Sequence, residues 1–439
     1  MKVIISKSQL NNVTIPVICS KSVAHRMLIA ASLCDNEVAL RINAYSEDIN
    51  ATVNVLEQLG AQYEQKDDIL LVKRSLSHRL ADRGAGVEFD CNESGSTARF
   101  ILTLSSLLYE KVKMTGRGKL PQRPFAPLNN ALREHGLIID SDYLPLNISG
   151  RLAAGDYYLP GDVSSQYISG LLFALPLLEG DSRIILTTKL TSKDYVAITL
   201  DVLKRFGVDI VEGENEYIIR GNQRYVAKDK LIDIEGDWSN AAFLLGVGAL
   251  DNKITVAGLN HKSHQGDKEI MNALAYFGAK LAGYMDADGR MCYEVSHNKL
   301  NGIRIDADNI PDMVPALSVI AAYAVGDTYI EHVERLRIKE SNRIESVTAV
   351  VRALGGDVTL VDNADSSDMI IHPVTIASNE DVIIDSYNDH RIVMCAALAA
   401  AAGNRRIVIN NAEAVNKSYP GFFEAYRQIG FEVTVSDDT

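Results

Sequence analysis

The chain has 439 residues, of which 47% are apolar and 23% are charged, and its formal net charge is −13. This length allows two to four domains, each large enough to bury a core. The negative charge argues against non-specific nucleic-acid binding, which needs a basic surface.

The five cysteines are scattered and never form a C-x-x-C pair. This pattern favours reduced thiols in a cytoplasmic protein over a disulfide framework or a structural zinc site. The start "MKVIISKSQL" has too short an apolar stretch for a signal peptide. No apolar run approaches the roughly 18 residues that would span a bilayer.

An amphipathic segment, a glycine and an extended segment recur in this order along the chain. The first copy reads "VNVLEQLGAQY" and the last reads "FFEAYRQIGFEVT". The six glycines lie 71 to 77 residues apart, at Gly60, Gly136, Gly207, Gly278, Gly355 and Gly430. The apolar spacing before each glycine predicts a helix that ends at a left-handed glycine cap. The sequence therefore predicts six structural repeats.

Each repeat also contains a polar turn followed by a strongly apolar helix. Examples are "SGSTARFILTLSSLL", "SNAAFLLGVGAL" and "DHRIVMCAALAAA". Few residues of these segments suit water, so we expect six buried helices, with the amphipathic helices outside them. Short apolar segments such as "RIILTT" predict strands, and the fold class is α/β with two helices and a mixed sheet in each repeat.

Six repeats are too many for one core of ordinary size, so we expect two domains of three repeats each. The third repeat ends near Ile234, and the strand "KVIISKS" has no partner in the first repeat. We therefore assign residues 20–234 to the first domain, and residues 1–19 with 235–439 to the second.

Small polar residues stand where the predicted buried helices begin, and helix N-termini bind anions. These residues are Ser22, Gly95, Ser96, Thr97, Ser164, Ser165, Gln166, Ser239, Asn240, Asp312, Asp389 and His390. Cations lie within the first turns, namely Lys21, Arg26, Arg99 and Arg391. If the helices share one direction, these ends converge on one face of each domain. We expect a cleft between the domains that attracts small, multiply charged anions.

Three further segments supply cations. "GKLPQRPF" contains Lys119 and Arg123, and "AVNKSYPGF" contains Lys417. "ERLRIKESNR" surrounds Glu340 with four cations, which are Arg335, Arg337, Lys339 and Arg343. Each has a structural alternative: the last run fits a solvated face, Arg123 could cap a turn, and Arg391 could pair with Asp389.

Two acids stand among these cations. A carboxylate beside cations stays ionised and can accept a proton, which suits Asp312 and Glu340. Lys21 beside bound anions would keep its proton and could donate it. Asp312 also fits a helix N-cap by residue type, and its spacing does not decide between the two roles.

Nine motifs follow one another across nearly the whole chain. They are "SKSVAHR", "SGSTAR", "QRP", "VSSQY", "TSKDY", "NIPDM", "RIKESNR", "YNDHR" and "NKSYPGFF". In this order they closely resemble the 5-enolpyruvylshikimate-3-phosphate (EPSP) synthase family. The resemblance implies an inside-out α/β barrel of two domains that close around the substrates.

The implied reaction moves the enolpyruvyl group of phosphoenolpyruvate to the 5-hydroxyl of shikimate 3-phosphate and releases phosphate. It proceeds by addition and elimination through a tetrahedral ketal, with no covalent enzyme intermediate, cofactor or metal. It belongs to the shikimate pathway, which leads to chorismate and the aromatic amino acids. The implied partners are these two small molecules alone, with no nucleic acid or membrane, and we expect a monomer.

The resemblance also implies roles for individual residues. The shikimate 3-phosphate ligands would be Lys21, Ser22, Arg26, Ser164, Ser165, Gln166, Ser192, Tyr195, Asp312 and Lys339. The phosphoenolpyruvate ligands would be Lys21, Gly95, Arg123, Gln166, Arg343, Arg391 and Lys417. Asp312 resembles the base for the attacking hydroxyl. Glu340 and Lys21 resemble the groups that move protons to and from the methylene carbon and the leaving phosphate.

Three residues depart from the family pattern. Glu93 and Arg335 stand where members of the family often have Asn, and Phe100 replaces a proline. An acid at position 93 would either weaken anion binding or turn outward. These positions leave the response to phosphonate inhibitors such as glyphosate open.

The sequence disfavours three alternative functions. The sister family that uses UDP-N-acetylglucosamine has a reactive cysteine before its Arg-Pro pair, and "GRGKLPQRP" has none. A catalytically silent binding protein would not need Lys21, Asp312 and Glu340. A metal enzyme would need a third ligand beside His261 and His264, and the sequence offers none nearby.

Overall fold

A computed structural model describes residues 1–363, 366–375 and 380–436 of the chain. The chain folds as two compact units. The terminal unit combines Met1–Ile18 with Glu235–Thr439, and the inserted unit is Cys19–Ile234. Cys19, expected at the end of the terminal segment, belongs to the inserted unit. Its backbone N–H donates to Asn43 Oδ1 at 2.7 Å, and its thiol lies 3.4 Å from the carbonyl oxygen of Ala44.

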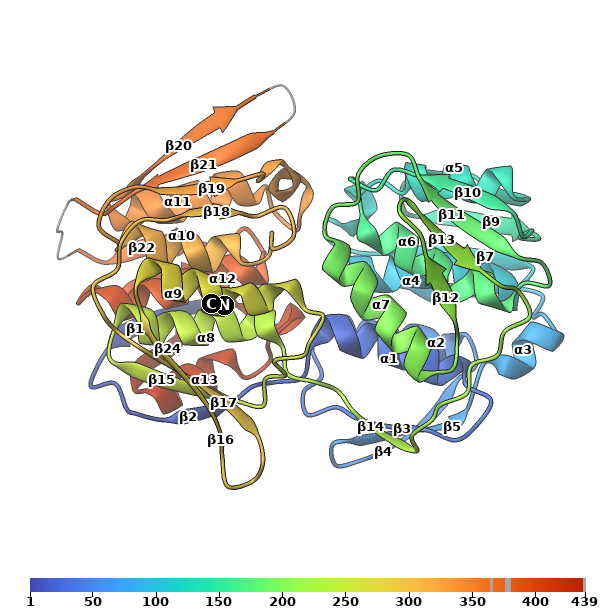
Figure 1. The fold of residues 1–439 in the computed structure, drawn as a ribbon, viewed down its shortest axis with the longest axis horizontal. Coiled ribbons are helices and arrows are strands. Elements are labelled where there is room, and N and C mark those ends of the chain that lie inside the picture. Colours follow the sequence, from blue (N-terminus) through green and yellow to red (C-terminus); the bar gives the residue numbers. More distant parts are fainter. Residues whose placement is uncertain (364–365, 376–379, 437–439) are drawn as a thin grey trace. The chain divides into compact units, whose positions relative to one another are not determined.

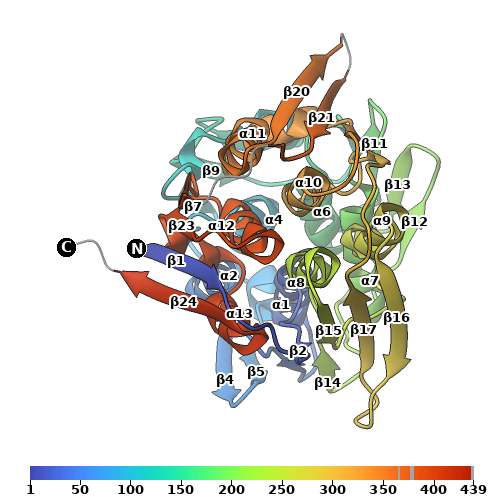
Figure 2. The ribbon, with the colours of Figure 1, turned by 90° about the vertical axis from the view of Figure 1, so that its left-hand side faces the viewer.

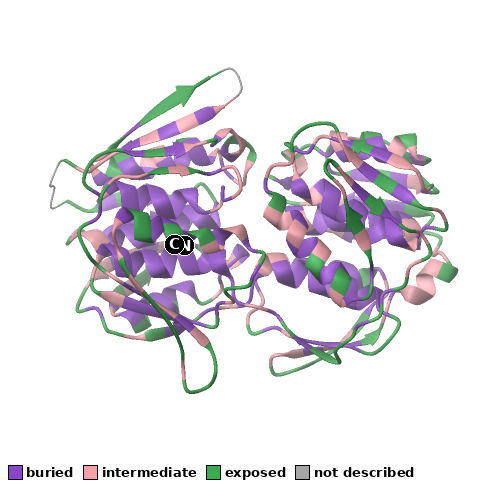
Figure 3. Ribbon diagram, viewed as in Figure 1, coloured by how far each residue is buried: buried purple, intermediate pink, exposed green. Residues whose placement is uncertain are grey.

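Buried helices form the centre of the inserted unit and carry its apolar core. They are α1 (Lys21–Leu33), α4 (Gly95–Leu108) and α6 (Ser165–Ala174). Figure 3 shows them almost wholly in the colour of buried residues. The amphipathic helices are α2 (Glu47–Gln58), α5 (Ala126–Glu134) and α7 (Lys193–Arg205), and α3 (Ser77–Ala81) is a short addition.

The terminal unit repeats this plan around a core of its own. Its buried helices are α8 (Trp238–Leu250), α10 (Val314–Ala322) and α12 (His390–Ala399), in which every residue is buried. The amphipathic helices are α9 (Ile270–Phe277), α11 (Arg343–Leu354) and α13 (Phe422–Ile429). Figure 2 shows the buried helices in the middle of this unit and its sheets around them. The prediction that the apolar helices are buried is confirmed.

Six four-stranded sheets share one topology, in which a parallel pair is followed by two antiparallel pairs (Figure 1). The first sheet of the inserted unit has the order β14 (Leu231–Asp233), β3 (Ala39–Arg41), β5 (Ile69–Arg74), β4 (Gln62–Lys66). The second is β6 (Val87–Asp90), β7 (Lys111–Thr115), β9 (Leu146–Gly150), β8 (Leu137–Ile139). The third is β10 (Asp156–Leu159), β11 (Ser182–Leu186), β13 (Glu216–Ile219), β12 (Ile210–Glu212).

The sheets of the terminal unit follow the same order. The first is β2 (Thr14–Pro16), β15 (Lys253–Ala257), β17 (Met291–Ser296), β16 (Lys280–Met285). The second is β18 (Arg304–Asp306), β19 (Thr328–Glu331), β21 (Ser367–His372), β20 (Asp357–Asp362). The third is β22 (Val382–Asp385), β23 (Ile407–Asn410), β1 (Lys2–Lys7), β24 (Phe431–Ser436).

Both units are closed by strands from the ends of their segments. β14 pairs in parallel with β3, so the last strand of the inserted unit joins its first sheet. β1 lies between β23 and β24, and Val3 is opposite both Ile409 and Val435. Each unit is therefore complete only when the two ends of its sequence meet.

The repeat glycines have the conformation that the sequence predicted. All six have a positive φ, between 75° and 111°, where each amphipathic helix ends. Gly136 shows why a side chain does not fit, because a Cβ there would stand 2.5 Å from the carbonyl oxygen of Arg151. The left-handed helix ends are confirmed.

The starts of the buried helices differ in detail from the prediction. Ser20, rather than Ser22, is the N-cap of α1, and its hydroxyl accepts from the backbone N–H of Val23. Met313 holds the N-cap position of α10, so Asp312 lies outside this helix and is not its cap. Among the described residues, no helix combines the length and hydropathy needed to cross a bilayer.

Candidate active site

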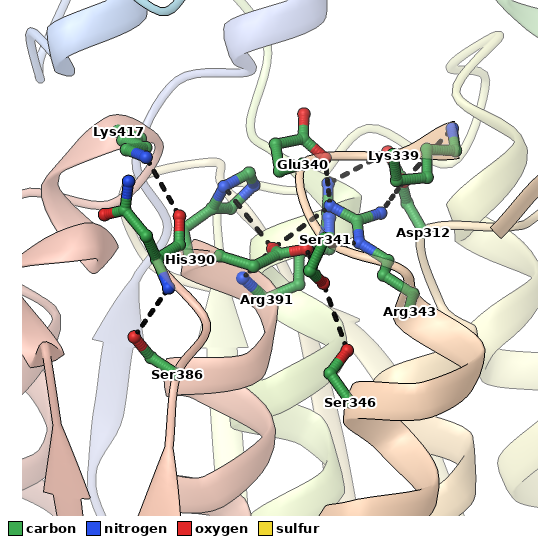
Figure 4. A network of polar contacts seen from close by, with 12 residues as sticks. Asp312, Lys339, Glu340, Ser341, Arg343, Ser346, Ser386, His390, Arg391 and Lys417 are labelled. Atoms are coloured by element: carbon green, nitrogen blue, oxygen red, sulfur yellow. Dashed lines mark hydrogen bonds and ion pairs between the residues drawn. The ribbon is translucent and has the colours of Figure 1, made fainter. Parts of the chain in front are cut away.

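Asp312 belongs to a charged cluster in the terminal unit, shown in Figure 4. Its Oδ1 accepts a hydrogen bond from Arg343 Nη1 at 2.6 Å, and its Oδ2 accepts from Arg391 Nη2 at 3.2 Å. Lys339 Nζ stands 3.7 Å from Oδ1. The loop before α10, the start of α11 with the segment before it, and the start of α12 thus bring one carboxylate together with three cations.

Arg343 connects the acids of this cluster and is only 1% exposed. Its Nη2 donates to Glu340 Oε2 at 2.6 Å, and its Nε donates to Asp389 Oδ2 at 2.9 Å. Burial lowers the pKa of Arg343, but the carboxylates of Asp389, Glu340 and Asp312 raise it further, so the net pKa lies well above its usual value. Arg343 is therefore a permanent cation that fixes the geometry of three acids.

Asp389 fixes the start of α12. Its Oδ1 accepts from the backbone N–H of Arg391 at 2.9 Å, and its Oδ2 accepts from the Ser341 hydroxyl at 2.9 Å. The guanidinium of Arg391 contacts Asp312 instead. The alternative of an Asp389–Arg391 ion pair is therefore wrong, because Asp389 pairs with Arg343.

Two lysines complete the cluster. Lys417 Nζ donates to the carbonyl oxygen of Asn388 at 2.9 Å, beside the start of α12. Burial lowers the pKa of Lys339 to about 8, although Asp312 opposes this shift. A bound anion near Lys339 would hold its proton in place.

The cation-rich run around Glu340 divides between the cluster and the surface. Lys339, Glu340 and Arg343 join the cluster, whereas Arg337 pairs with Asp362 of β20 at 2.8 Å. Both side chains of that pair are well exposed, at 38% and 54%. The solvated-face alternative is correct for Arg337 and wrong for Lys339 and Arg343.

In the inserted unit, the start of α1 holds Lys21 and Arg26. Lys21 Nζ contacts Asp48 Oδ2, in the first turn of α2, at 2.7 Å. Arg26 is 2% exposed, and its nitrogens donate to the carbonyl oxygens of Ser22 (2.6 Å) and Tyr195 (3.0 Å) and to the Thr199 hydroxyl (2.7 Å). Burial among these neutral groups lowers its pKa to about 9. Arg26 thus ties α1 to α7.

Gly95 opens α4 against two guanidinium groups. A Cβ at this position would stand 2.7 Å from Arg123 Nη1 and 2.9 Å from Arg99 Nη1, so a larger residue would displace these guanidinium groups. Arg99 Nη1 donates to Gln166 Oε1 at 2.8 Å. Arg123 Nε is buried, and none of the described residues hydrogen-bonds to it. A charged donor beside a helix N-terminus is well suited to an anion.

Serines shape the remaining part of this face. The Ser164 hydroxyl caps α6 by accepting from the backbone N–H of Gln166 at 3.3 Å, and buried Ser165 follows it. Ser192 has a left-handed backbone with a φ of 50° and precedes α7. Its carbonyl oxygen accepts from the backbone N–H of Tyr195 at 3.1 Å, which fixes the first turn of that helix.

The structure shows the surroundings of the three residues that depart from the family pattern. The ring of Phe100 lies 4.8 Å below the guanidinium of buried Arg26, a cation–π contact. The Glu93 carboxylate lies against Gly118, where a Cβ would overlap it. Gly118 belongs to the loop that carries Arg123, so the acid faces that loop. Arg335 lies in the 3₁₀ turn Glu334–Ile338, half-buried.

Sequence reasoning missed Asp48 and Asp267. Asp48 pairs with Lys21, 27 residues earlier, and Asp267 accepts from the Ser239 hydroxyl, 28 residues earlier. The period of the repeat was the one available signal, because both acids follow a buried-helix start by nearly the same interval. His261 and His264 are exposed, and within the described ranges no three His, Cys, Asp or Glu side chains form a possible metal site.

Comparisons with known proteins relate the chain to one family over most of its length. The family model described as EPSP synthase (3-phosphoshikimate 1-carboxyvinyltransferase) matches residues 5–426. The chain is 41% identical over 418 residues to the 3-phosphoshikimate 1-carboxyvinyltransferase of Clostridium kluyveri, covering 94% of each protein. It is 39% identical over 432 residues to that of Clostridium perfringens strain SM101, covering 98% of each.

Solved structures share the fold. The EPSP synthase of Acinetobacter baumannii superposes with a TM-score of 0.79 at 22% identity, covering 99% of this chain and all of that one. The enolpyruvyl transferase NikO of Streptomyces tendae gives a TM-score of 0.75 at 16% identity, covering 99% and 98% of the two chains. The match of the family model and the identity to the clostridial relatives show that the chain belongs to the EPSP synthase family.

Proposed function

We propose that the protein catalyses the reaction of its family, and that the residues described above bind the substrates and move the protons. The enolpyruvyl group of phosphoenolpyruvate is transferred to the 5-hydroxyl of shikimate 3-phosphate, and phosphate is released. The product leads to chorismate and the aromatic amino acids. The observation that carries this proposal is Asp312, a carboxylate held by Arg343 and Arg391 and faced by Lys339.

The addition step needs a base and an acid. Asp312 takes the proton from the 5-hydroxyl, whose oxygen forms a bond to C2 of phosphoenolpyruvate. Lys21 gives a proton to the methylene carbon C3, and the tetrahedral ketal forms. In the elimination, the bond from C2 to the phosphate oxygen breaks and C3 gives a proton to the carboxylate of Glu340. The phosphate leaves with the proton that Asp312 took from the hydroxyl, and the proton on Glu340 returns to Lys21.

Different sets of residues would bind the two substrates. Phosphoenolpyruvate would bind Arg123 at the start of α4, together with Gly95, Gln166, Arg343, Arg391 and Lys417. Shikimate 3-phosphate would bind Ser22, Arg26, Ser164, Ser165, Gln166, Ser192, Tyr195, Asp312 and Lys339. Lys21 would contact both. Arg343 can offer few hydrogen bonds to phosphoenolpyruvate, because four of its five N–H groups already point at carboxylates of the described residues.

The cellular location follows from thiol chemistry. All five cysteines are free and buried. Free thiols persist in a reducing compartment, so we propose that the enzyme works in the cytoplasm.

Phosphate release by the purified protein tests the proposal. Phosphoenolpyruvate is supplied with shikimate 3-phosphate in one reaction and with UDP-N-acetylglucosamine in the other. We expect release with the shikimate ester alone. Release with the nucleotide sugar alone would assign the chain to the sister reaction, and binding without any release would make it a silent binding protein.

A further inference from the structure

A further buried carboxyl group, that of Asp267, lies within electrostatic reach of Arg391. Asp267 belongs to the 3₁₀ turn Gly266–Glu269, before α9, and is 4% exposed. Its Oδ2 accepts a short hydrogen bond from the hydroxyl of Ser239, in the first turn of α8. Neither residue is among the groups assigned to the substrates above, but Ser239 contacts one of those groups, Arg391. Both residues are buried near the charged cluster, which suits a structural role in supporting it.

Ser239 connects Asp267 to Arg391 through its two ends. Its hydroxyl donates to Asp267, and its carbonyl oxygen lies 3.5 Å from Arg391 Nη1. Arg391 Nη2 then donates to Asp312 Oδ2 at 3.2 Å. A continuous series of polar contacts therefore runs from Asp267 to the proposed base.

We propose that Asp267 is a positioning residue that holds the start of α8, and through it Arg391, against Asp312. The proposal rests on the role of Asp312 given above. Asp267 acts through Ser239 and Arg391 rather than on the substrates. It also places a second ionisable group within electrostatic reach of the base.

The charges around Asp267 come from four elements. Asp237 at the start of α8 and Asp312 before α10 raise its proton affinity, and Arg391 of α12 lowers it. In its own turn, Lys268 Nζ points to the carbonyl oxygen of Ser263, and Glu269 accepts from Asn272. The packed helix α9, "IMNALAYF", has no charged residue. Burial is the largest influence, and together these effects raise the pKa of Asp267 to about 7.

Asp267 and Asp312 must influence each other equally. Because the charge of Asp312 disfavours ionisation of Asp267, an ionised Asp267 raises the proton affinity of Asp312 by the same free energy. Asp267 is largely neutral at pH 6 and ionised at pH 8. The base at Asp312 therefore becomes stronger as pH rises through 7.

The Asp267→Asn variant tests this coupling. Its amide keeps the shape and can accept from Ser239, but it never ionises. We expect the kcat of Asp267→Asn to equal that of the wild type at pH 6 and to fall about fivefold or more below it at pH 8. The measurement is kcat from pH 5.5 to 9 with both substrates saturating. Asp362→Asn is the matched control, because Asp362 also accepts from a serine hydroxyl, that of Ser367, on the exposed β20.

A constant ratio of variant to wild type at every pH would overturn the proposal, since a merely structural loss has no reason to follow pH. Ser239→Ala is the second variant and keeps the test open if Asp267→Asn fails to fold. The Ser239 hydrogen bond lowers the pKa of Asp267, so its loss should move the inflection of the profile to higher pH. An unmoved inflection would contradict the role.

A second assay distinguishes an error in this proposal from an error in the proposed function. Asp312→Asn is assayed in parallel at each pH. Near-normal turnover by Asp312→Asn would overturn the assignment of the base, and this inference with it. Loss of turnover in Asp312→Asn together with a constant Asp267→Asn ratio would overturn the positioning role alone.

Discussion

The two units share a fold but differ in what surrounds their buried arginines. Arg26 in the inserted unit and Arg343 in the terminal unit are 2% and 1% exposed. Arg26 donates to carbonyl and hydroxyl oxygens, and burial lowers its pKa to about 9. Arg343 donates to three carboxylates, which more than offset its burial and raise its pKa. The same architecture therefore holds one arginine with neutral groups and the other with acids.

This difference suits the inserted unit to anion binding and the terminal unit to proton transfer. In the inserted unit, buried Arg26 contacts neutral oxygens, and no described residue hydrogen-bonds to Arg123 Nε, so we propose that these two cations serve an anionic ligand. In the terminal unit, Asp312 and Glu340 are held by cations and can exchange protons. Shared topology thus fixes where helix starts lie, and the residues placed there decide the chemistry.

The largest expected effect is loss of proton transfer in the terminal unit. Glu340→Gln keeps the shape of the side chain and its acceptor for Arg343, but it cannot carry a proton from C3. We expect kcat to fall by about 10²–10⁴-fold with little change in either KM. Steady-state kinetics measure this, and Glu345→Gln, an exposed position in α11, is the control. A Glu340→Gln enzyme with near-normal kcat would remove the acid–base role of that residue.

The next effect compares the two buried arginines directly. Arg343→Met leaves three carboxylates without their shared cation, and breaking a buried ion pair costs about 3–5 kcal/mol. Arg26→Met leaves carbonyl and hydroxyl oxygens unpaired, which costs about 1–3 kcal/mol. Urea unfolding at pH 7 should therefore show the larger loss of unfolding free energy for Arg343→Met. The reverse order would contradict the comparison between the units.

A smaller effect concerns substrate selectivity in the inserted unit. Arg123→Ala removes a charged donor beside Gly95, and one charge-assisted hydrogen bond contributes about 1.5–3 kcal/mol. We expect KM for phosphoenolpyruvate to rise about tenfold or more, and KM for shikimate 3-phosphate to change little. Arg117→Ala is the control from the same loop, because that side chain is 73% exposed and pairs with Asp90. Equal increases in both KM values would place Arg123 elsewhere.

The smallest effect is a dependence on pH at Lys339. Because the pKa of Lys339 is lowered to about 8, its ammonium form is mostly present at pH 7 and mostly lost at pH 9. KM for shikimate 3-phosphate should rise by up to about tenfold between pH 8 and pH 9. Lys339→Arg, which stays charged, should flatten this rise. A wild-type KM that is constant across this interval would contradict the role of Lys339.

The sequence predicted the repeats because their signals are local. Gly60 and its five equivalents end helices, and the apolar helix segments are buried as their composition requires. The sequence could not predict which side chains from distant segments come into contact. Arg337 and Arg343 belong to the same cation-rich run, but Arg337 is exposed and pairs with Asp362, 25 residues away.

Asp312 illustrates the same limit. A carboxylate at a helix start suits both a cap and a site, and the two-residue interval before α10 decides against the cap. Asp48 and Asp267 have no local signal, since their partners lie 27 and 28 residues earlier. Only the tertiary structure shows which residues come together around the start of a buried helix.

Calorimetric binding and turnover of Asp312→Asn together test most directly whether substrate binding and proton transfer are separable. We predict that the variant binds shikimate 3-phosphate within about threefold of the wild-type Kd, because the other proposed ligands remain, while kcat falls by about 100-fold or more. Near-normal kcat, or binding and turnover that fall by the same factor, would contradict the account.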